Sequence, residues 1–272
     1  MVPVKSTVAA TERFAEVYVD YELASPPPHP GSGWTRFVCI SDTHSRLFPV
    51  PDGDVLLHAG DLSSWGHPSQ VDLTLKWLQK LGHPAKIIIG GNHDVGMDRQ
   101  YFGPHDVSVS NKEQDSSLEA IRKKLKSKEL FKANVHYLQH ESVTITTSEG
   151  KTWSIFGSPV PPQYARGAFQ YGSEDEARTI YQQIPLGIDI LLTHTPPHFI
   201  LDKTRRGKNA GCPYLAARMQ DLEQCRLHVF GHIHEAWGAD ITDEGVRRVS
   251  VNAAVDYRGS RAIIVDLRND TK

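Results

Sequence analysis

The sequence has few cysteines, no long apolar run and almost no net charge, and each shortage excludes a class of protein. Its three cysteines, Cys39, Cys212 and Cys225, form no C-x-x-C pair, so we expect reduced thiols in a cytoplasmic protein and not a disulfide framework. No stretch approaches the ~18 consecutive apolar residues of a membrane span, so we expect no membrane partner. Charges throughout the first 30 residues predict that there is no signal peptide.

The charge balance argues against a polyanionic partner. The formal net charge is -2, so we expect no nucleic-acid partner. At 272 residues and 39% hydrophobic content, the chain can bury one large core or two packed sheets as a single domain. Fourteen histidines are many for this length, and they suggest a metal site.

The first part of the chain differs from the rest. Residues 1–34 are interpreted as an N-terminal arm and a proline-rich connector, and residues 35–272 as the domain. The apolar residues Phe14, Val17 and Val19 predict a short edge strand or an arm across the body. The proline-rich stretch at residues 25–33 predicts a stiff and then flexible connection.

The most informative pattern is an apolar strand that ends in polar, chemically active residues, and it occurs five times. Residues 87–89 are three isoleucines, followed by two glycines and then Asn92, His93 and Asp94. The glycines predict a sharp turn where side chains would interfere. The other expected strands span residues 36–40, 54–59, 188–193 and 227–230. They are followed by Asp42-x-His44, Gly60-Asp61, His194 and Gly231-His232-x-His234.

The order of the first elements places several of these residues together. A helix expected at residues 70–81 returns the chain from the second strand to the third, which is a parallel βαβ arrangement. Parallel strands present their carboxyl ends at one edge, where open α/β sheets bind ligands. We therefore expect Asp42, His44, Asp61 and Asn92 on one rim.

The remaining elements predict a second sheet and further helices. Capping boxes at Ser116–Glu119 and Ser173–Glu176 predict helix starts at those points. Strands expected at residues 135–138, 142–147 and 153–156 read as a hairpin-rich second sheet. The other predicted elements are a helix at residues 213–222 and strands at residues 246–251 and 262–267. No internal repeat and no second domain is evident.

The side chains at the five strand ends are suited to metal. Carboxylate and amide oxygens together with imidazoles fit manganese, iron or zinc, whereas calcium prefers mostly oxygen. A pair of cations about 3.5–4 Å apart needs a bridging carboxylate, and Asp61 is the natural candidate. Isolated histidines on strands are usually structural, and we expect that role for His58, His83, His136 and His228.

Together these motifs resemble the calcineurin-like metallophosphoesterase superfamily. The resemblance covers residues 35–267. The stretches around Asp42-x-His44 and Gly231-His232-x-His234 look like the brain-type metallophosphoesterase-domain subfamily, which is similar to class III cyclic-nucleotide phosphodiesterases. The resemblance implies a four-layer α/β/β/α sandwich with two mixed sheets and a dinuclear metal site at the strand carboxyl ends. It assigns one metal to Asp42, His44, Asp61 and His234, and the other to Asp61, Asn92, His194 and His232.

The resemblance leaves His93 uncoordinated beside the metals as a catalytic residue. As an imidazolium it can neutralise charge on the phosphoryl group or protonate the leaving alkoxide. Asp94 is the second catalytic candidate, either orienting His93 or only capping the following turn. Arg46 is the candidate substrate-binding residue, with a plain surface role as the alternative.

The predicted function is a dinuclear metal-dependent phosphoesterase. Two cations lower the pKa of a bridging water so that hydroxide can attack phosphorus in line. Small phosphodiesters or cyclic nucleotides are the expected substrates, so the enzyme would be a phosphodiesterase, with its oligomeric state open. The alternatives are a nucleotide- and metal-binding regulatory protein with vestigial activity, and a phosphomonoesterase or protein phosphatase. Some subfamily members lack the first histidine of Gly-His-x-His and are weakly active, whereas His232 is present here.

Overall fold

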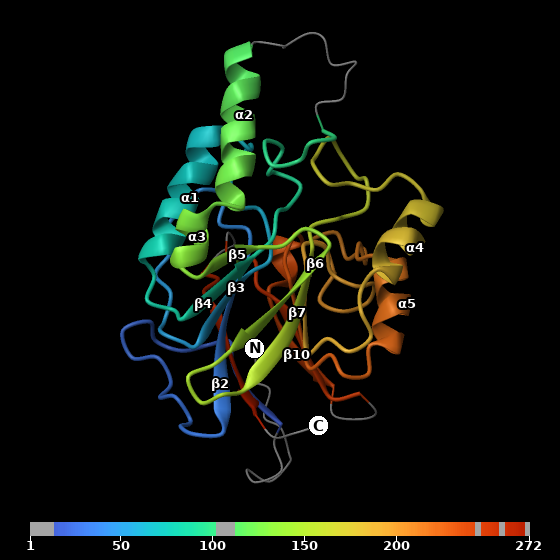
Figure 1. The fold of residues 1–272 in the computed structure, drawn as a ribbon. Helices are drawn as coiled ribbons and strands as arrows, with labels where there is room; N and C mark the ends of the chain where they lie inside the picture. Colours follow the sequence, from blue (N-terminus) through green and yellow to red (C-terminus); the bar gives the residue numbers. More distant parts are fainter. Residues whose placement is uncertain (1–13, 102–111, 243–245, 256–258, 270–272) are drawn as a thin grey trace.

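The computed structural model describes residues 14–101, 112–242, 246–255 and 259–269. Two six-stranded sheets lie face to face, and helices cover the outer face of each (Figure 1). This arrangement confirms the four-layer α/β/β/α sandwich with two mixed sheets. None of the helices in the described ranges is long and apolar enough to cross a membrane.

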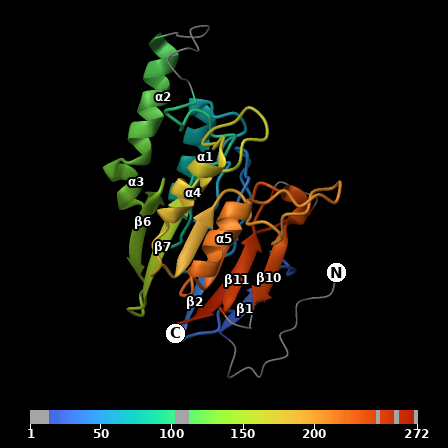
Figure 2. The same ribbon diagram turned by 90° about the vertical axis from the view of Figure 1, so that its right-hand side faces the viewer.

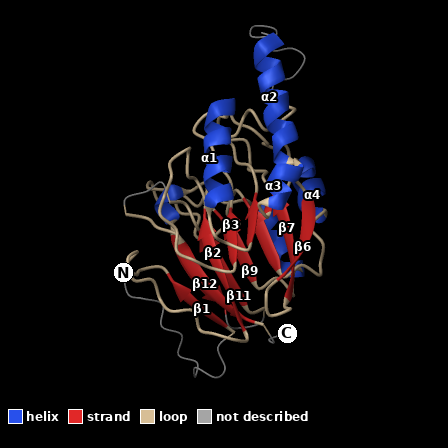
Figure 3. Cartoon of the chain, turned by 60° about the vertical axis from the view of Figure 1, so that its left-hand side comes forward, coloured by secondary structure: helices blue, strands red, loops and turns tan. Residues whose placement is uncertain are grey.

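The first sheet has the strand order β1-β12-β2-β3-β4-β5. The pairs β2–β3, β3–β4 and β4–β5 are parallel, whereas β12 pairs antiparallel with both β2 and β1. Figure 3 shows β1, β12, β2 and β3 side by side. The strands are β1 (Ala15–Tyr18), β2 (Trp34–Ile40), β3 (Val55–His58), β4 (Ala85–Ile88), β5 (Val135–Tyr137) and β12 (Ile263–Arg268).

The second sheet has the order β10-β11-β9-β8-β7-β6. Its central pairs β11–β9, β9–β8 and β8–β7 are parallel, and antiparallel hairpins close both edges. The strands are β6 (Glu141–Thr146), β7 (Thr152–Ser158), β8 (Ile190–Thr193), β9 (Leu227–Phe230), β10 (Gly238–Thr242) and β11 (Arg248–Asn252).

The helices form the two outer layers. Three helices cover the first sheet: α1 (Pro68–Lys80), α2 (Lys112–Leu125) and α3 (Lys128–Lys132). Two helices, α4 (Glu174–Gln182) and α5 (Pro213–Asp221), lie side by side across the second sheet (Figure 2). In α4 the Ser173 hydroxyl caps the backbone N–H of Glu176, as predicted.

Alternation along the strands divides the apolar residues between two cores. Phe37 on β2 faces Trp153 on β7 across the gap between the sheets, with their rings edge to face at 5.3 Å. The neighbouring residue Val38 belongs instead to the cluster that includes Val71 and Leu75 of α1. Because successive side chains of a strand point to opposite faces, strands buried on both sides carry continuous apolar runs.

Two predictions about individual elements were wrong, and one strand was missed. Strand β5 joins the first sheet beside β4 and not the second, because the chain crosses through α2 and α3 and returns parallel. Helix α2 begins at Lys112, so Ser116 lies inside it and does not cap it. Strand β10 was not predicted at all; a 3₁₀ helix at His234–Ala236 leads the chain into it.

Strand β1 confirms the edge-strand alternative for the arm, while the domain boundary at residue 35 stays a prediction.

The register brings the important strand ends together. Ile40 of β2 pairs with His58 of β3, and His58 pairs with Ile88 of β4. In the second sheet, Leu192 of β8 pairs with Val229 of β9. Each of these strands ends a few residues before the predicted site residues, so all five loops leave the sandwich along one edge.

Candidate metal centre

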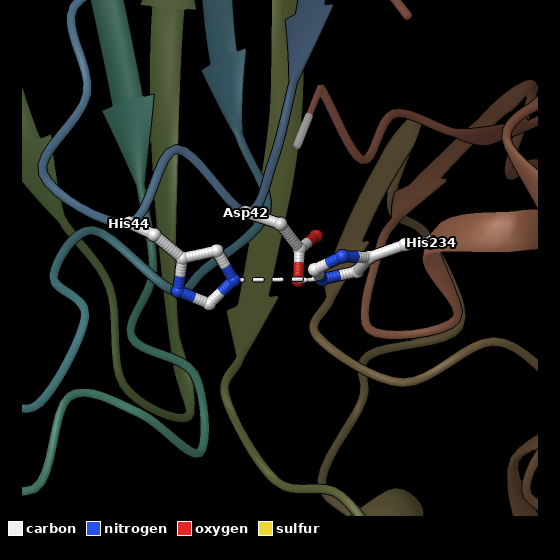
Figure 4. A group of neighbouring side chains, drawn as sticks. All are labelled: Asp42, His44 and His234. Carbon is white, nitrogen blue, oxygen red and sulfur yellow. Dashed lines mark hydrogen bonds and ion pairs between the residues drawn. The ribbon is translucent and has the colours of Figure 1, made fainter. Parts of the chain in front are cut away.

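The first ligand loop holds Asp42 in an unfavourable backbone conformation. Asp42 and His44 both have positive φ values, 55° and 47°, a left-handed conformation that costs free energy for residues other than glycine. The buried Asp42 carboxylate accepts the backbone N–H of His232 at 3.1 and 3.2 Å from its two oxygens. Its Oδ1 is 3.1 Å from Nε2 of His234, and that nitrogen lies 3.5 Å from Nε2 of His44 (Figure 4). Side chains from both sheets therefore meet here.

Asp61 lies between the two predicted metal positions. It too has a positive φ, 54°. Its Oδ1 accepts the backbone N–H of His93 at 2.8 Å, which leaves Oδ2 directed at imidazoles. Oδ2 is 3.4 Å from Nε2 of His194 and 3.8 Å from Nε2 of His44. One carboxylate is thus in reach of both ligand groups, as a bridging residue must be.

His194 is fixed so that one ring nitrogen faces the site. Its Nδ1 lies 2.9 Å from the carbonyl oxygen of Ala59, and because a carbonyl only accepts, Nδ1 is the donor. That leaves Nε2, which faces the Asn92 side-chain oxygen at 2.9 Å and Asp61 at 3.4 Å. Three atoms with lone pairs therefore converge, and a proton or a cation must lie among them.

Glycine is required where the loops approach each other most closely. A Cβ on Gly231 would lie 1.9 Å from Oδ2 of Asp42, and one on Gly91 would lie 2.3 Å from Oδ1 of Asp61. A Cβ on Gly60 would lie 2.5 Å from the carbonyl oxygen of Gly90. The structure thus confirms the expectation that these turns have no room for side chains.

The buried carboxylates and histidines of the site shift one another's pKa values. Burial raises the pKa of Asp42, but the hydrogen bond and charge of His234 lower it more, so its net pKa is lowered. For Asp61 burial also raises the pKa, and His194 reverses that shift. Burial lowers the pKa of His194, but the charge and hydrogen bond of Asp61 raise it to about 9. Without metal, His194 therefore holds a proton that a cation would replace.

The donor set fits divalent metal ions. Three groups have ligand atoms that all lie within 4.8 Å of one another: Asp42 with His44 and His234, Asp42 with Asp61 and His194, and His44 with Asp61 and His93. The first group lies within one predicted ligand set, the second joins residues of both sets, and the third contains His93, which we expect to stay uncoordinated. Asn92 adds an amide oxygen beside His194, and mixed oxygen and imidazole donors suit manganese, iron or zinc.

The position of His232 differs from that of the other predicted histidine ligands. Within the described ranges, none of the close groups includes it, although its ring centroid is 5.0 Å from that of His194. Its φ is 67°, and its backbone rather than its ring binds Asp42. Burial, and then the charge of His194, lower the pKa of its imidazole to about 4, so the ring is neutral as a ligand must be.

His93 is oriented by a residue that the sequence did not indicate. Its Nδ1 lies 2.7 Å from the carbonyl oxygen of Ser64 and must donate to it. Nε2 is therefore the ring nitrogen left for substrate or metal. The His93 ring stands edge-on to that of His44 at 4.7 Å. Nothing in the sequence around Ser64 signals this contact, because it depends on a backbone carbonyl.

Asp94 points away from the His93 imidazole and joins two loops. Its Oδ2 accepts the backbone N–H groups of Leu62 at 3.0 Å and Gly91 at 2.9 Å. Its Oδ1 accepts the backbone N–H and the hydroxyl of Ser63. Burial, and then the charge of Asp61, raise the pKa of Asp94, and the hydrogen bonds from Ser63 and Leu62 offset only part of this rise. The net pKa is about 7. In the structure Asp94 positions the two loops. The His93 ring is oriented by the carbonyl oxygen of Ser64 and not by Asp94.

The other predicted residues lie outside the cluster. Arg46 is exposed on the loop after His44, and its guanidinium lies over the Phe48 ring at 5.5 Å, so phosphate binding by Arg46 stays a prediction. The structural roles expected for His58 and His228 are confirmed, because both are buried against threonine hydroxyls, Thr43 and Thr193.

Comparisons with known proteins agree with this chemistry. A family model described as calcineurin-like phosphoesterase matches residues 35–236. Human metallophosphoesterase domain-containing protein 1 is 36% identical over 224 residues, which are 80% of this chain and 67% of the human protein. UPF0046 protein K07C11.7 of Caenorhabditis elegans is 33% identical over 245 residues, 88% of this chain and 76% of that protein.

Two solved structures resemble this fold at low sequence identity. A phosphopantetheinyl hydrolase from Mycobacterium tuberculosis has a TM-score of 0.45 and 16% identity, covering 84% of this chain and 91% of its own. A dimetal phosphatase from Danio rerio has a TM-score of 0.48 and 10% identity, covering 87% and 93%.

Proposed function

Because this chain belongs to the calcineurin-like phosphoesterase family, and so is a metal-dependent phosphoester hydrolase, we propose that it is a phosphodiesterase that uses two divalent cations. The observation that carries the proposal is the position of Asp61. One of its oxygens lies within 3.8 Å of imidazoles from two ligand groups. Manganese, iron and zinc are the proposed metals, and small phosphodiesters the proposed substrates, with cyclic nucleotides among them.

The proposed ligands form two sets, one for each cation. Asp42, His44 and His234 would hold one cation, and Asn92, His194 and His232 the other, with Asp61 shared. When bound, two cations would activate a water for attack on phosphorus and polarise the phosphoryl oxygens. The protein supplies a rigid cradle, since the Asp42 carboxylate is anchored by the backbone of His232 and Asp61 by the backbone of His93.

His93 supplies the remaining chemistry. With Nδ1 donating to Ser64, its Nε2 can carry a second proton and give it to the departing alkoxide, or can neutralise charge on the phosphoryl group. General acid catalysis matters most for leaving groups that are poor without a proton.

The buried, free cysteines are consistent with our proposal of a reducing, cytoplasmic location.

A second candidate function is a metal- and nucleotide-binding regulatory protein with vestigial activity. Among the described residues no close ligand group includes His232, which favours this candidate, because a second cation held without that ring would be bound more weakly and catalysis would suffer. The two candidates differ in turnover and not in binding.

The decisive experiment is metal reconstitution. Protein stripped by a chelator should be loaded separately with manganese, iron or zinc and its metal content measured. Each sample is then assayed on cyclic nucleotides, aryl phosphodiesters and aryl phosphomonoesters. We expect two metals per chain and hydrolysis that favours diesters. A preference for monoesters would point to a phosphomonoesterase, and nucleotide binding without turnover would support the regulatory alternative.

A further inference from the structure

Trp65 lies beside the proposed general acid with most of its surface open to solvent. The side chain is 73% exposed, and its ring centroid is 5.3 Å from that of His93, with the two planes tilted by 52°. Single exposed apolar residues are normal on protein surfaces. The position next to a catalytic imidazole is what distinguishes Trp65.

The loop around Trp65 is held firmly on several sides. The Trp65 backbone N–H donates to the Gln70 side chain of α1 at 3.1 Å. Its neighbour Ser64 donates its hydroxyl to the carbonyl oxygen of His44 at 2.6 Å and accepts from His93. On the other side, Gly66 donates its backbone N–H to the Ser63 hydroxyl at 2.9 Å.

Gly66 also sets how closely this loop approaches the loop that follows Asn92. Its φ is +68°, and a Cβ there would lie 2.4 Å from the backbone nitrogen of Gly96. The indole is thus carried by backbone that is bonded to the loops of two metal ligands and to the first turn of α1. A backbone held in this way limits the positions open to the indole, which reduces the entropy lost when a ligand covers it.

From this geometry we infer that Trp65 is a specificity-determining residue that stacks on a planar aromatic leaving group of the substrate. The inference rests on the proposed function, in which Nε2 of His93 serves the leaving oxygen. A group attached to that oxygen lies next to His93 and hence next to the indole. The substrate class that this favours is a phosphodiester of an aromatic alcohol.

Stacking should appear as a selective loss in a matched pair of substrates. Phenyl methyl phosphate has a planar leaving group, and hexafluoroisopropyl methyl phosphate has a non-planar one derived from an alcohol of similar acidity. Stacking on an aromatic side chain is worth about 5- to 160-fold in binding. Trp65→Ala should therefore lower kcat/KM for the phenyl ester by that factor, mainly through KM, and leave the other ester within about twofold.

The controls separate stacking from a general structural role. Trp65→Phe should restore most of the lost preference, because it keeps an aromatic face. Phe131→Ala removes another exposed aromatic ring, which packs on His136 and not on His93. This variant should leave kcat/KM unchanged for both esters. Equal losses on both esters in Trp65→Ala would overturn the inference.

A binding measurement keeps the test valid if catalysis is absent. Calorimetry on the metal-loaded protein gives the affinities for phenylphosphonate and methylphosphonate. Wild type should prefer the phenyl compound, and Trp65→Ala should lose that preference. If wild type hydrolyses neither ester but shows this pattern, the phosphodiesterase proposal fails while stacking by Trp65 stands. An unchanged preference in Trp65→Ala would refute the stacking role.

Discussion

One carboxylate oxygen of Asp94 binds Ser63 twice, accepting its backbone N–H at 2.8 Å and its hydroxyl at 2.6 Å. The other oxygen accepts N–H groups from Leu62 and Gly91. Asp94 therefore ties the loop that carries Asp61 to the loop that carries Asn92. Both its oxygens accept hydrogen bonds from these groups, so an amide nitrogen in place of either oxygen would face donors.

Asp94→Asn should consequently destabilise the fold. The amide nitrogen would meet two donors in place of an acceptor oxygen, at a cost of about 2–4 kcal/mol in the free energy of unfolding. Urea denaturation of the metal-free protein measures the change. Asp72→Asn, the same substitution at a partly exposed carboxylate that pairs with Lys76 and Lys124, should cost less than about 1 kcal/mol. Similar losses in both variants would show that Asp94 does not hold the loops.

Asp61→Asn should remove metal from both positions, because this carboxylate faces imidazoles of both ligand groups. We expect well under one metal per chain by elemental analysis. The rate should fall more than about 100-fold, since outer-shell partners alone are worth 10–100-fold. Asp72→Asn again serves as the matched control and should keep its metals. Two metals still bound to Asp61→Asn would exclude Asp61 as the bridge.

His93→Ala should keep its metals and slow the reaction about 10²–10⁴-fold. The loss should grow as the leaving alcohol becomes less acidic, because nitrophenolate departs without a proton and an alkoxide does not. The measurement is kcat/KM over a series of leaving groups, with metal content determined on the same samples. A uniform loss would instead assign His93 to stabilising the phosphoryl charge, and a loss of metal would make it a ligand. His136→Ala, on β5, should behave as wild type.

His232→Gly tests the ring that lies outside the close ligand groups. Three protein ligands would remain for the second cation, so we expect weaker metal affinity at that position. Nucleotide should still bind, while turnover falls. Metal titrations followed by activity measure both effects. Full activity at low metal concentration would mean that the second cation is dispensable.

Two buried histidines should each make the metal-free protein less stable in acid, whereas Asp94, whose pKa is raised to about 7, acts in the opposite direction. Burial lowers the pKa of His58 to about 3 and holds the pKa of His228 well below its usual range. Thr193 donates its hydroxyl to the carbonyl oxygen of Thr195, so Nε2 of His228 must donate to Thr193. Nδ1 of His228 is buried and has no hydrogen-bond partner among the described residues. Both rings therefore stay neutral in the folded protein.

The sign of the effect follows from the unfolded state, where histidine has a pKa near 6.5. Below that pH these two histidines bind protons in the unfolded chain but not in the folded protein, so their contribution to stability falls as pH falls from about 6.5 toward 3. Each such histidine contributes up to about 1.4 kcal/mol per pH unit. Urea denaturation at pH 6.5, 5.5 and 4.5 should show a shallower slope for His228→Gln than for wild type. An unchanged slope would mean that His228 is protonated in the fold.

Much of the fold and the metal cluster could be predicted from sequence because both are encoded locally. Apolar runs such as residues 87–89 mark strands buried on both faces, and Gly91 and Gly231 mark turns that bring the next residues close to Asp61 and Asp42. Parallel strands end at one edge, so the order of strands was enough to gather Asp42, Asp61 and His194 at one place.

Only the tertiary structure decided contacts that depend on backbone groups distant in sequence. The sheet to which β5 belongs is set by packing of α2 and α3 and not by its own residues, which would suit either sheet. His93 takes its orientation from the Ser64 carbonyl, and a carbonyl oxygen is present at every residue, so no residue type marks it. For the same reason Asp94 reads as a catalytic partner in sequence, and its four donors, three of them backbone N–H groups, show it to be a support.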